Sequence, residues 1–247
     1  MKHVGSFLDS TYLKTASQAS LSELENQQIL IKMVQEAIKL NIKLVMIRPN
    51  YVCMTRVFLD EQNSNVLLGT VIDFPLGEAT LEAKLIEAEK AIFDGADELD
   101  YVVNYQAFQK GDFHSVREQI NVCTDLCLKN GKVAKWIIEI AALSDKEIAG
   151  LTNLISKEIE QSFPKSVERV FVKSSTGFYQ RADDGPVGAT ASAMKIMKDN
   201  AGKLPLKAAG GIRNIEDVIK MIDLGASRIG TSSAKQIILG GQSATDY

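Results

Sequence analysis

The feature that most constrains the fold is the alternation of short β-patterned runs with longer helix-patterned stretches along the whole 247-residue chain. Short apolar and β-branched runs predict buried strands. We expect strands at 3–8, 44–48, 66–72, 98–103, 134–140, 168–173, 205–209 and 226–230. Amphipathic stretches between them predict helices; 79–94 begins at a Thr80 cap, and 214–223 begins at Asn214 and ends before a glycine.

Repeated strand–helix units without a Pro-, Gly- or Ser-rich linker predict one α/β domain, a single (β/α)8 TIM barrel. We expect this barrel to span residues 1–239 and to be followed by a flexible tail at 240–247. An open doubly wound sheet is the alternative. It usually carries a Gly-rich fingerprint after its first strand, where this chain has DSTYLK.

Composition excludes several classes of function. With a formal net charge of −3 and no basic run, the chain lacks the basic face of nucleic-acid-binding proteins. No segment approaches the length of about 18 apolar residues that a membrane span needs. Only two histidines are present, so we expect no metal site. The odd number of cysteines, Cys53, Cys123 and Cys127, suits the reducing cytoplasm, with Cys123 and Cys127 packed in the core.

Charged residues share one face of the central strands. In the fourth expected strand Glu98 and Asp100 have the same parity, and in the fifth Lys135 and Glu139 do. The apolar face of each strand should pack against helices, while the charged face of a closed barrel points inward. Buried charges cost free energy unless they are paired or used. The pattern therefore indicates a polar site inside the barrel.

Lys135, Lys173 and Lys207 lie on three consecutive expected strands. Lowering a lysine pKa from about 10.4 to about 7 takes about 4.6 kcal/mol. A second positive charge about 5 Å away supplies about 3.3 kcal/mol at an effective dielectric constant of about 20. With partial desolvation, Lys207 should make Lys173 an amine that attacks carbonyls and forms a Schiff base. The alternative is that these lysines reach solvent at strand ends or pair with carboxylates.

Asp100 is the natural proton carrier of this site because it faces inward on the fourth strand. The alternative is a structural partner for Lys135 or Lys207. Both roles are compatible, because a carboxylate can hold an ammonium in place and also pass protons through a water molecule.

Small residues follow the last strands, where barrel enzymes often bind phosphate through backbone N–H groups. AGGIR follows the seventh strand, GTSS follows the eighth, and SSTG follows the sixth. The expected phosphate site therefore consists of Gly177, Gly210, Gly211, Gly230, Ser232 and Ser233. Taken singly, such motifs usually mean a turn and a helix cap.

From Asp9 to Ser233 the chain resembles the 2-deoxy-D-ribose-5-phosphate aldolases, a class I aldolase family. The resemblance rests on FLDSTYLK, GTVIDFPLG, GADELDYVVN, KWIIEI, VFVKSSTGF, GATASAMKIM, LKAAGGIRNIEDV and GASRIGTSSA, in the family's order. It implies a TIM-barrel lyase that reversibly cleaves deoxyribose 5-phosphate to glyceraldehyde 3-phosphate and acetaldehyde. Such an enzyme serves deoxyribonucleotide catabolism.

The resemblance also assigns roles to residues. The family's Schiff-base lysine falls on Lys173, its proton-relaying aspartate on Asp100 and its second lysine on Lys207, and its phosphate loops fall on the small residues named above. No metal or organic cofactor is implied, and barrels of this kind are often homodimers. Supporting positions are Lys135, Asp9, Thr11, Thr176 and, if the tail folds over the site, Tyr247.

The chain departs from the family pattern at Met46 and Arg48 in the second strand, at Ser174, and at Phe178 after STG. These departures concern substrate contacts and the pH optimum, not the imine chemistry. Two rival functions remain at this stage. One is another phosphate-binding barrel enzyme, such as an isomerase or a transaldolase-like enzyme, and the other is a phosphosugar-binding regulator without turnover.

Overall fold

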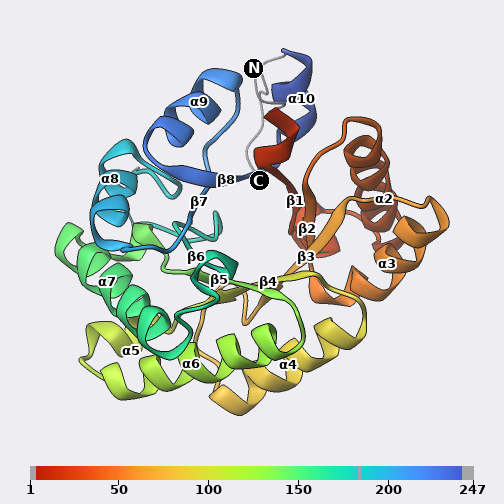
Figure 1. The fold of residues 1–247 in the computed structure, drawn as a ribbon. Coiled ribbons are helices and arrows are strands. Elements are labelled where there is room, and N and C mark those ends of the chain that lie inside the picture. The colour runs from red at the N-terminus through yellow and green to blue at the C-terminus, as the bar shows by residue number, and fades with distance from the viewer. Residues whose placement is uncertain (1–3, 183–184, 241–247) are drawn as a thin grey trace.

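In the computed structural model, which describes residues 4–182 and 185–240, eight parallel strands form a closed barrel in chain order, with β8 pairing back to β1. Figure 1 shows the strands as a central ring with the helices outside it. The strands are β1 (Leu8–Tyr12), β2 (Leu44–Ile47), β3 (Leu67–Ile72), β4 (Glu98–Val102), β5 (Val133–Ile137), β6 (Val170–Lys173), β7 (Leu206–Ala209) and β8 (Ala226–Thr231). The predicted (β/α)8 barrel is confirmed.

Helices cover the outside of the barrel. They are α1 (Ala16–Ala19), α2 (Glu23–Lys39), α3 (Val52–Glu61), α4 (Leu81–Phe93), α5 (Tyr105–Gln109), α6 (Phe113–Lys129), α7 (Asp145–Ser162), α8 (Ala191–Asn200), α9 (Ile215–Asp223) and α10 (Ala234–Leu239). Four short 3-10 helices are η1 (Val4–Phe7), η2 (Pro49–Tyr51), η3 (Ile140–Ala142) and η4 (Val167–Arg169). Both predicted caps are confirmed. Thr80 Oγ1 accepts a hydrogen bond from Ala83 N at 3.2 Å, and Asn214 Oδ1 accepts one from Asp217 N at 2.8 Å.

The predicted first strand is wrong, because residues 4–7 form η1 and the strand occupies Leu8–Tyr12. The sequence LDSTY resembles a loop, since three of its five residues are polar. It forms a strand because its backbone pairs with both β2 and β8. Its carboxylate, Asp9, is compensated inside the barrel by cations from distant strands. The other predicted strands agree with the structure within a few residues.

The apolar face of each strand packs against the helices, as the alternation predicted. Tyr101 on β4 stacks on Trp136 on β5 with ring centroids 5.0 Å apart, and Trp136 Nε1 donates a hydrogen bond to Thr124 Oγ1 of α6 at 3.0 Å. Cys123 and Cys127 are buried on the same helix, so their predicted role in core packing is confirmed. This packing closes the barrel around its inward-facing residues.

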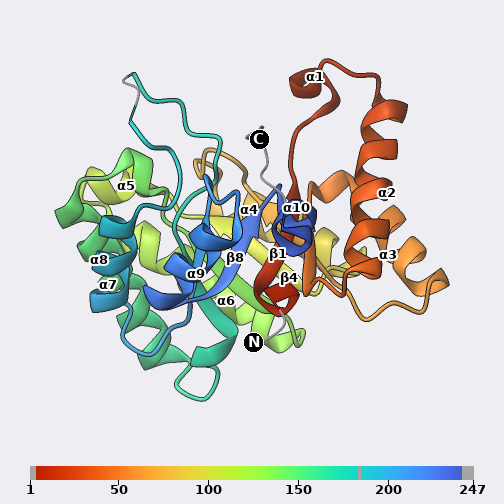
Figure 2. The ribbon, with the colours of Figure 1, turned by 90° about the horizontal axis from the view of Figure 1, so that it is seen from above.

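The carboxyl ends of the strands meet at one end of the barrel. In Figure 2, α1 and the described residues between β6 and α8, 174–182 and 185–190, extend from the same end. Within the described ranges, no helix is both long and apolar enough to cross a membrane. The domain boundary at residue 239 stays a prediction. Of the predicted tail 240–247, residues 241–247 lie outside the described part, and Tyr247 lies there with them.

Candidate active site

Three lysines converge on one carboxylate inside the barrel. Asp100 Oδ1 accepts a hydrogen bond from Lys135 Nζ at 2.7 Å, and its Oδ2 accepts from Lys173 Nζ and Lys207 Nζ, both at 2.8 Å. The strand register produces this meeting, because Asp100 pairs with Lys135 across β4 and β5 and Lys173 pairs with Lys207 across β6 and β7. The structure therefore brings the predicted catalytic residues together. Of the alternative for these lysines, the placement of their side chains in solvent is wrong, and their pairing with carboxylates is confirmed.

Further charges lie next to this group. Lys207 forms an ion pair with Asp9 at 2.7 Å, and Lys135 forms one with Glu98 at 2.6 Å. Arg228 on β8 connects the two carboxylates, since its Nη1 donates to Glu98 at 3.1 Å and its Nε donates to Asp9 at 2.9 Å. The result is a single network of ion pairs across the barrel interior.

Asp9 and Thr11 come after the end of the predicted first strand, 3–8, and this placement outside the strand is wrong. Both are buried within β1, because the strand starts later than predicted. Thr11 Oγ1 donates to the backbone oxygen of Asp9 at 2.9 Å. Asp9 therefore contributes charge to the interior network and does not lie at the opening of the barrel.

The network is electrically balanced when Lys173 is neutral. In the described part of the interior, the charges of Asp9, Glu98 and Asp100 match those of Lys135, Lys207 and Arg228. A proton on Lys173 adds a positive charge that these six groups do not balance. Because a buried net charge costs free energy, this balance favours the neutral amine.

The pKa of Lys173 is lowered from 10.5 to about 8. Burial is the largest cause, since this side chain is only 2% exposed. The carboxylate of Asp100 opposes the shift, and the charge of Lys207 lowers the pKa further. Lys207, the neighbour predicted to cause the shift, contributes to it, but desolvation is the larger cause.

Two other groups of the network, Lys135 and Asp100, have pKa values shifted toward their charged forms. Burial alone would lower the pKa of Lys135, but Asp100 and Glu98 outweigh it and raise that pKa to about 12. Burial would raise the pKa of Asp100, but the three surrounding lysines hold it well below its ordinary value. Lys173 is thus set apart from Lys135 by a lowered pKa, the property an amine nucleophile needs.

A cavity of about 550 Å³ lies beyond the ends of β6 and β7. Of the predicted phosphate residues, Gly177, Gly210 and Gly211 line it, together with the segment 185–189. Gly188 was not singled out from the sequence. A Cβ added to Gly188 would lie 2.3 Å from the carbonyl carbon of Gly210, so only glycine permits this approach of the two backbones. The motif GPVGAT was the available signal.

Gly230, Ser232 and Ser233 do not line this cavity. Gly230 lies against Lys207, where an added Cβ would be 3.2 Å from Lys207 Cε, so it makes room for that lysine. Ser232 lines a different hollow between α2 and α10. Ser233 is buried, and its N–H donates to Thr231 Oγ1 at 2.9 Å.

Three of the departures from the family pattern lie together. Met46 belongs to a buried apolar cluster formed with Leu13, Leu44 and Val71, against which Phe74 and Phe178 pack. The Arg48 guanidinium lies 5.0 Å from the ring centroid of Phe74 and 5.9 Å from that of Phe178. Its Nε donates to the backbone oxygen of Leu13 at 2.7 Å. The departures thus form one apolar and aromatic wall with a single fixed cation.

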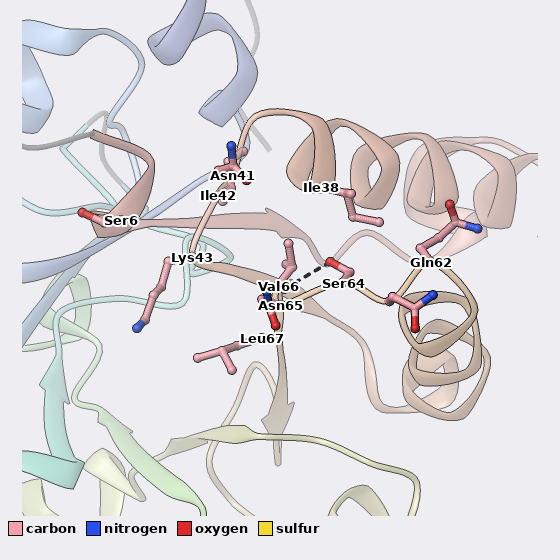
Figure 3. Close-up of a pocket in the computed structure, with 11 residues that line it drawn as sticks. Ser6, Ile38, Asn41, Ile42, Lys43, Gln62, Ser64, Asn65, Val66 and Leu67 are labelled. Carbon is pink, nitrogen blue, oxygen red and sulfur yellow. Dashed lines mark hydrogen bonds between the residues drawn. The ribbon is translucent and has the colours of Figure 1, made fainter.

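Two further observations limit where chemistry can occur. A polar hollow shown in Figure 3 lies at the amino ends of β2 and β3, between Lys43 and Val66, which is the opposite end of the barrel from the cavity. No catalytic candidate lines it. Over the described residues, no group of three or more His, Cys, Asp or Glu side chains is arranged to hold a metal ion.

Sequence reasoning assigned no role to Glu98, Arg228 or Glu139. The first two complete the charged network, and their signal was the inward parity of Glu98 in ELDYV and of Arg228 in ASRIG. Glu139 is buried just beyond β5 and accepts a hydrogen bond from Thr176 N at 3.1 Å. Thr176, a predicted supporting residue, is therefore held by a carboxylate that was predicted to face inward but was given no role.

Comparison with known proteins agrees with this geometry. Residues 8–238 match the model of the family described as DeoC/LacD family aldolase. The chain is 39% identical to a deoxyribose-phosphate aldolase of Staphylococcus haemolyticus over 98% of both chains, and 35% identical to one of Thermococcus gammatolerans over 94% of this chain and 96% of that one.

Solved structures give the same picture. A protein from Coccidioides immitis described as a putative deoxyribose-phosphate aldolase superposes with a TM-score of 0.79 at 30% identity, covering 96% of this chain and 85% of that one. A tetrameric deoxyribose phosphate aldolase from Aeropyrum pernix superposes with a TM-score of 0.76 at 27% identity, covering 96% of this chain and 89% of that one.

Proposed function

Because the chain belongs to the DeoC/LacD aldolase family, we propose that it is a Schiff-base aldolase that reversibly cleaves 2-deoxy-D-ribose 5-phosphate to D-glyceraldehyde 3-phosphate and acetaldehyde. The single observation that carries the proposal is the buried Lys173 amine, hydrogen-bonded to Asp100 and with its pKa lowered to about 8. An amine with this pKa is partly neutral at physiological pH and can attack an aldehyde.

In the cleavage direction, the Lys173 nitrogen bonds to the aldehyde carbon C1 of the sugar and gives a carbinolamine. Loss of water leaves a cationic iminium. The C3 hydroxyl then gives up its proton, the C2–C3 bond breaks, and its electron pair moves toward the iminium nitrogen. Glyceraldehyde 3-phosphate leaves, and the remaining two carbons form a neutral enamine on Lys173. Protonation at C2 and hydrolysis release acetaldehyde and restore the amine.

Asp100 and Lys207 are the groups we assign to proton transfer, with water as the intermediary. Asp100 contacts the Nζ atoms of both Lys173 and Lys207 at 2.8 Å, so it is within reach of a proton exchanged at Lys173. Lys135 holds the other oxygen of Asp100 at 2.7 Å and fixes its orientation.

For the phosphate group we propose the cavity lined by Gly177, Gly188, Gly210 and Gly211. Glycines leave backbone N–H groups accessible, and such groups bind phosphate oxygens well. The assignment of Ser232 and Ser233 to the phosphate site stays a prediction, since neither lines this cavity.

The test is to incubate the protein with acetaldehyde, reduce it with borohydride and map the modified peptide. We expect Lys173 to gain an ethyl group, and we expect Lys173→Met to lose both the label and sugar cleavage. An isomerase would not be labelled. A regulator would bind the phosphosugar without turnover, and its affinity would survive Lys173→Met. A homodimer and a cytoplasmic location stay predictions, and light scattering of the purified protein tests the first.

A further inference from the structure

Glu139 occupies a constrained position next to the nucleophile's strand. It is 1% exposed and adopts a left-handed backbone conformation, with φ 55° and ψ 71°. The residues on either side bind the β6 backbone: Ile138 N donates to the oxygen of Lys173 at 3.0 Å, and Ile140 N donates to that of Ser174 at 2.9 Å. A non-glycine residue is held in this conformation only when its surroundings determine it, which is common at functional sites.

The side chain of Glu139 is fixed through one oxygen. Its Oε2 accepts from Thr176 N at 3.1 Å and from Thr176 Oγ1 through a short hydrogen bond, and Thr176 Oγ1 accepts in turn from Phe178 N at 3.0 Å. Its other oxygen, Oε1, is buried and has no hydrogen-bond partner of ordinary geometry. The Ala141 N–H is the other backbone group that lowers the pKa of this carboxyl. Glu139 thus ties down the segment that follows Lys173 through one of its two carboxylate oxygens.

The carboxylate of Glu139 also lacks an ion-pair partner among the described residues. The interior network of Asp9, Glu98 and Asp100, in contrast, is balanced by other cations. That balance holds while Lys173 is neutral and fails once an iminium forms on it, because the iminium carries a positive charge. A buried charge of this kind needs a counter-charge nearby.

We propose that Glu139 is a positioning residue that supplies this counter-charge to the Lys173 iminium and, through Thr176, holds the 174–177 segment against it. The proposal rests on the proposed function, because the iminium is an intermediate of that reaction. Glu139 acts on the reacting nitrogen through space and through Thr176, and it forms no bond with substrate.

The charged and titratable groups around Glu139 are Lys173 from β6, Tyr105 from α5, and Arg181 from the segment after β6, whose Nη1 donates to the oxygen of Ala141 at 3.1 Å. Burial raises the pKa of Glu139, while the hydrogen bonds from Thr176 and the charge of Lys173 oppose that rise. The pKa of Tyr105 is raised by burial and by the charge of Glu139. Glu139 and Lys173 are therefore electrostatically coupled.

The experiment compares Glu139→Gln with the wild-type chain. Glutamine keeps the shape and the acceptor for Thr176 but removes the charge. The rate of acetaldehyde-dependent trapping at Lys173 by cyanoborohydride is measured against pH. Without the facing negative charge the pKa of Lys173 falls, so we expect the acid limb of the profile to move about one pH unit lower and the kcat of sugar cleavage to fall about tenfold.

Two control variants separate charge from position. Thr176→Val keeps the charge and removes a hydrogen bond, so kcat should fall while the acid limb stays in place. Glu168→Gln removes an exposed carboxylate just before β6 and should change neither quantity. If Glu139→Gln does not fold, Glu139→Asp is measured in its place. The aspartate retains the negative charge, so the acid limb of its profile should coincide with that of the wild type.

The outcomes are distinguishable. If the acid limb of the Glu139→Gln profile matches that of the wild type, the inference is overturned and the aldolase proposal stands. A displaced acid limb in Glu139→Asp has the same meaning. A wild-type chain that gains no label at Lys173 overturns the proposed function itself.

Discussion

The barrel interior has two unlike halves. On β2 and β3 the inward positions are apolar, with Leu44, Met46 and Val71 packed under Phe74 and Phe178. From β4 through β8 and on to β1 the inward positions carry the ion-pair network, which contains Asp9, Glu98, Asp100, Lys135, Lys173, Lys207 and Arg228. Both halves are buried to the same degree, yet burial has opposite consequences in them.

In the apolar half, burial stabilises the fold by about 25 cal/mol for each Å² removed from water. In the charged half, the same exclusion of water costs free energy and lowers the pKa of Lys173. The barrel thus obtains stability from one half and an amine with a lowered pKa from the other.

The largest expected effect comes from Asp100→Asn in the charged half. Three lysines lose their shared carboxylate, so we expect the free energy of unfolding to fall by about 3–5 kcal/mol. The loss of a proton carrier should lower kcat/KM by about 10²–10⁴-fold. Urea unfolding and steady-state cleavage of deoxyribose 5-phosphate measure the two quantities. Activity close to that of the wild type would remove Asp100 from the mechanism.

The matched change in the apolar half is Leu44→Ala. It removes buried methyl groups next to Gly69 and leaves every ion pair intact, so we expect a loss of about 2–5 kcal/mol of stability. Under conditions where the variant stays folded, kcat should change by less than about tenfold. A fall in kcat as large as that of Asp100→Asn would show that the two halves are not separable in function.

The smallest expected effect is the acid sensitivity of the network. The pKa of Asp9 is lowered from 3.8 to about 2, because Arg228 and Lys207 outweigh the opposing effect of burial. A carboxyl with a lowered folded-state pKa contributes stability that is complete above about pH 3.8 and lost as the pH falls through about 2. This contribution is about 2 kcal/mol.

Unfolding by urea at a series of pH values between about 4 and 2 measures this slope. Asp9→Asn should be less stable throughout, since Arg228 and Lys207 lose a partner, but its stability should depend less steeply on pH. An equal slope in both proteins would mean that Asp9 does not titrate in this range.

Much of the fold and of the site followed from local pattern. The side-chain period of two placed Asp100 and Lys135 on the inner face, and the caps at Thr80 and Asn214 fixed two helix starts, because these signals depend only on neighbouring residues. The first strand was misplaced because its polar residues are compensated by partners far away in the sequence. Ser232 was assigned to the phosphate site from its motif and from the family resemblance, and that assignment stays a prediction; in the structure Ser232 lines a different hollow from Gly210 and Gly211.

By itself, the sequence determined the eightfold strand–helix order, the face on which the charges lie and the lysine most suited to attack an aldehyde, since periodicity and residue chemistry are local properties. Only the tertiary structure decided which charges neutralise one another. Asp9 and Arg228 are 219 positions apart and meet because the barrel closes between β1 and β8. That closure sets the dielectric environment and the charge balance, and these two quantities lower the pKa of Lys173.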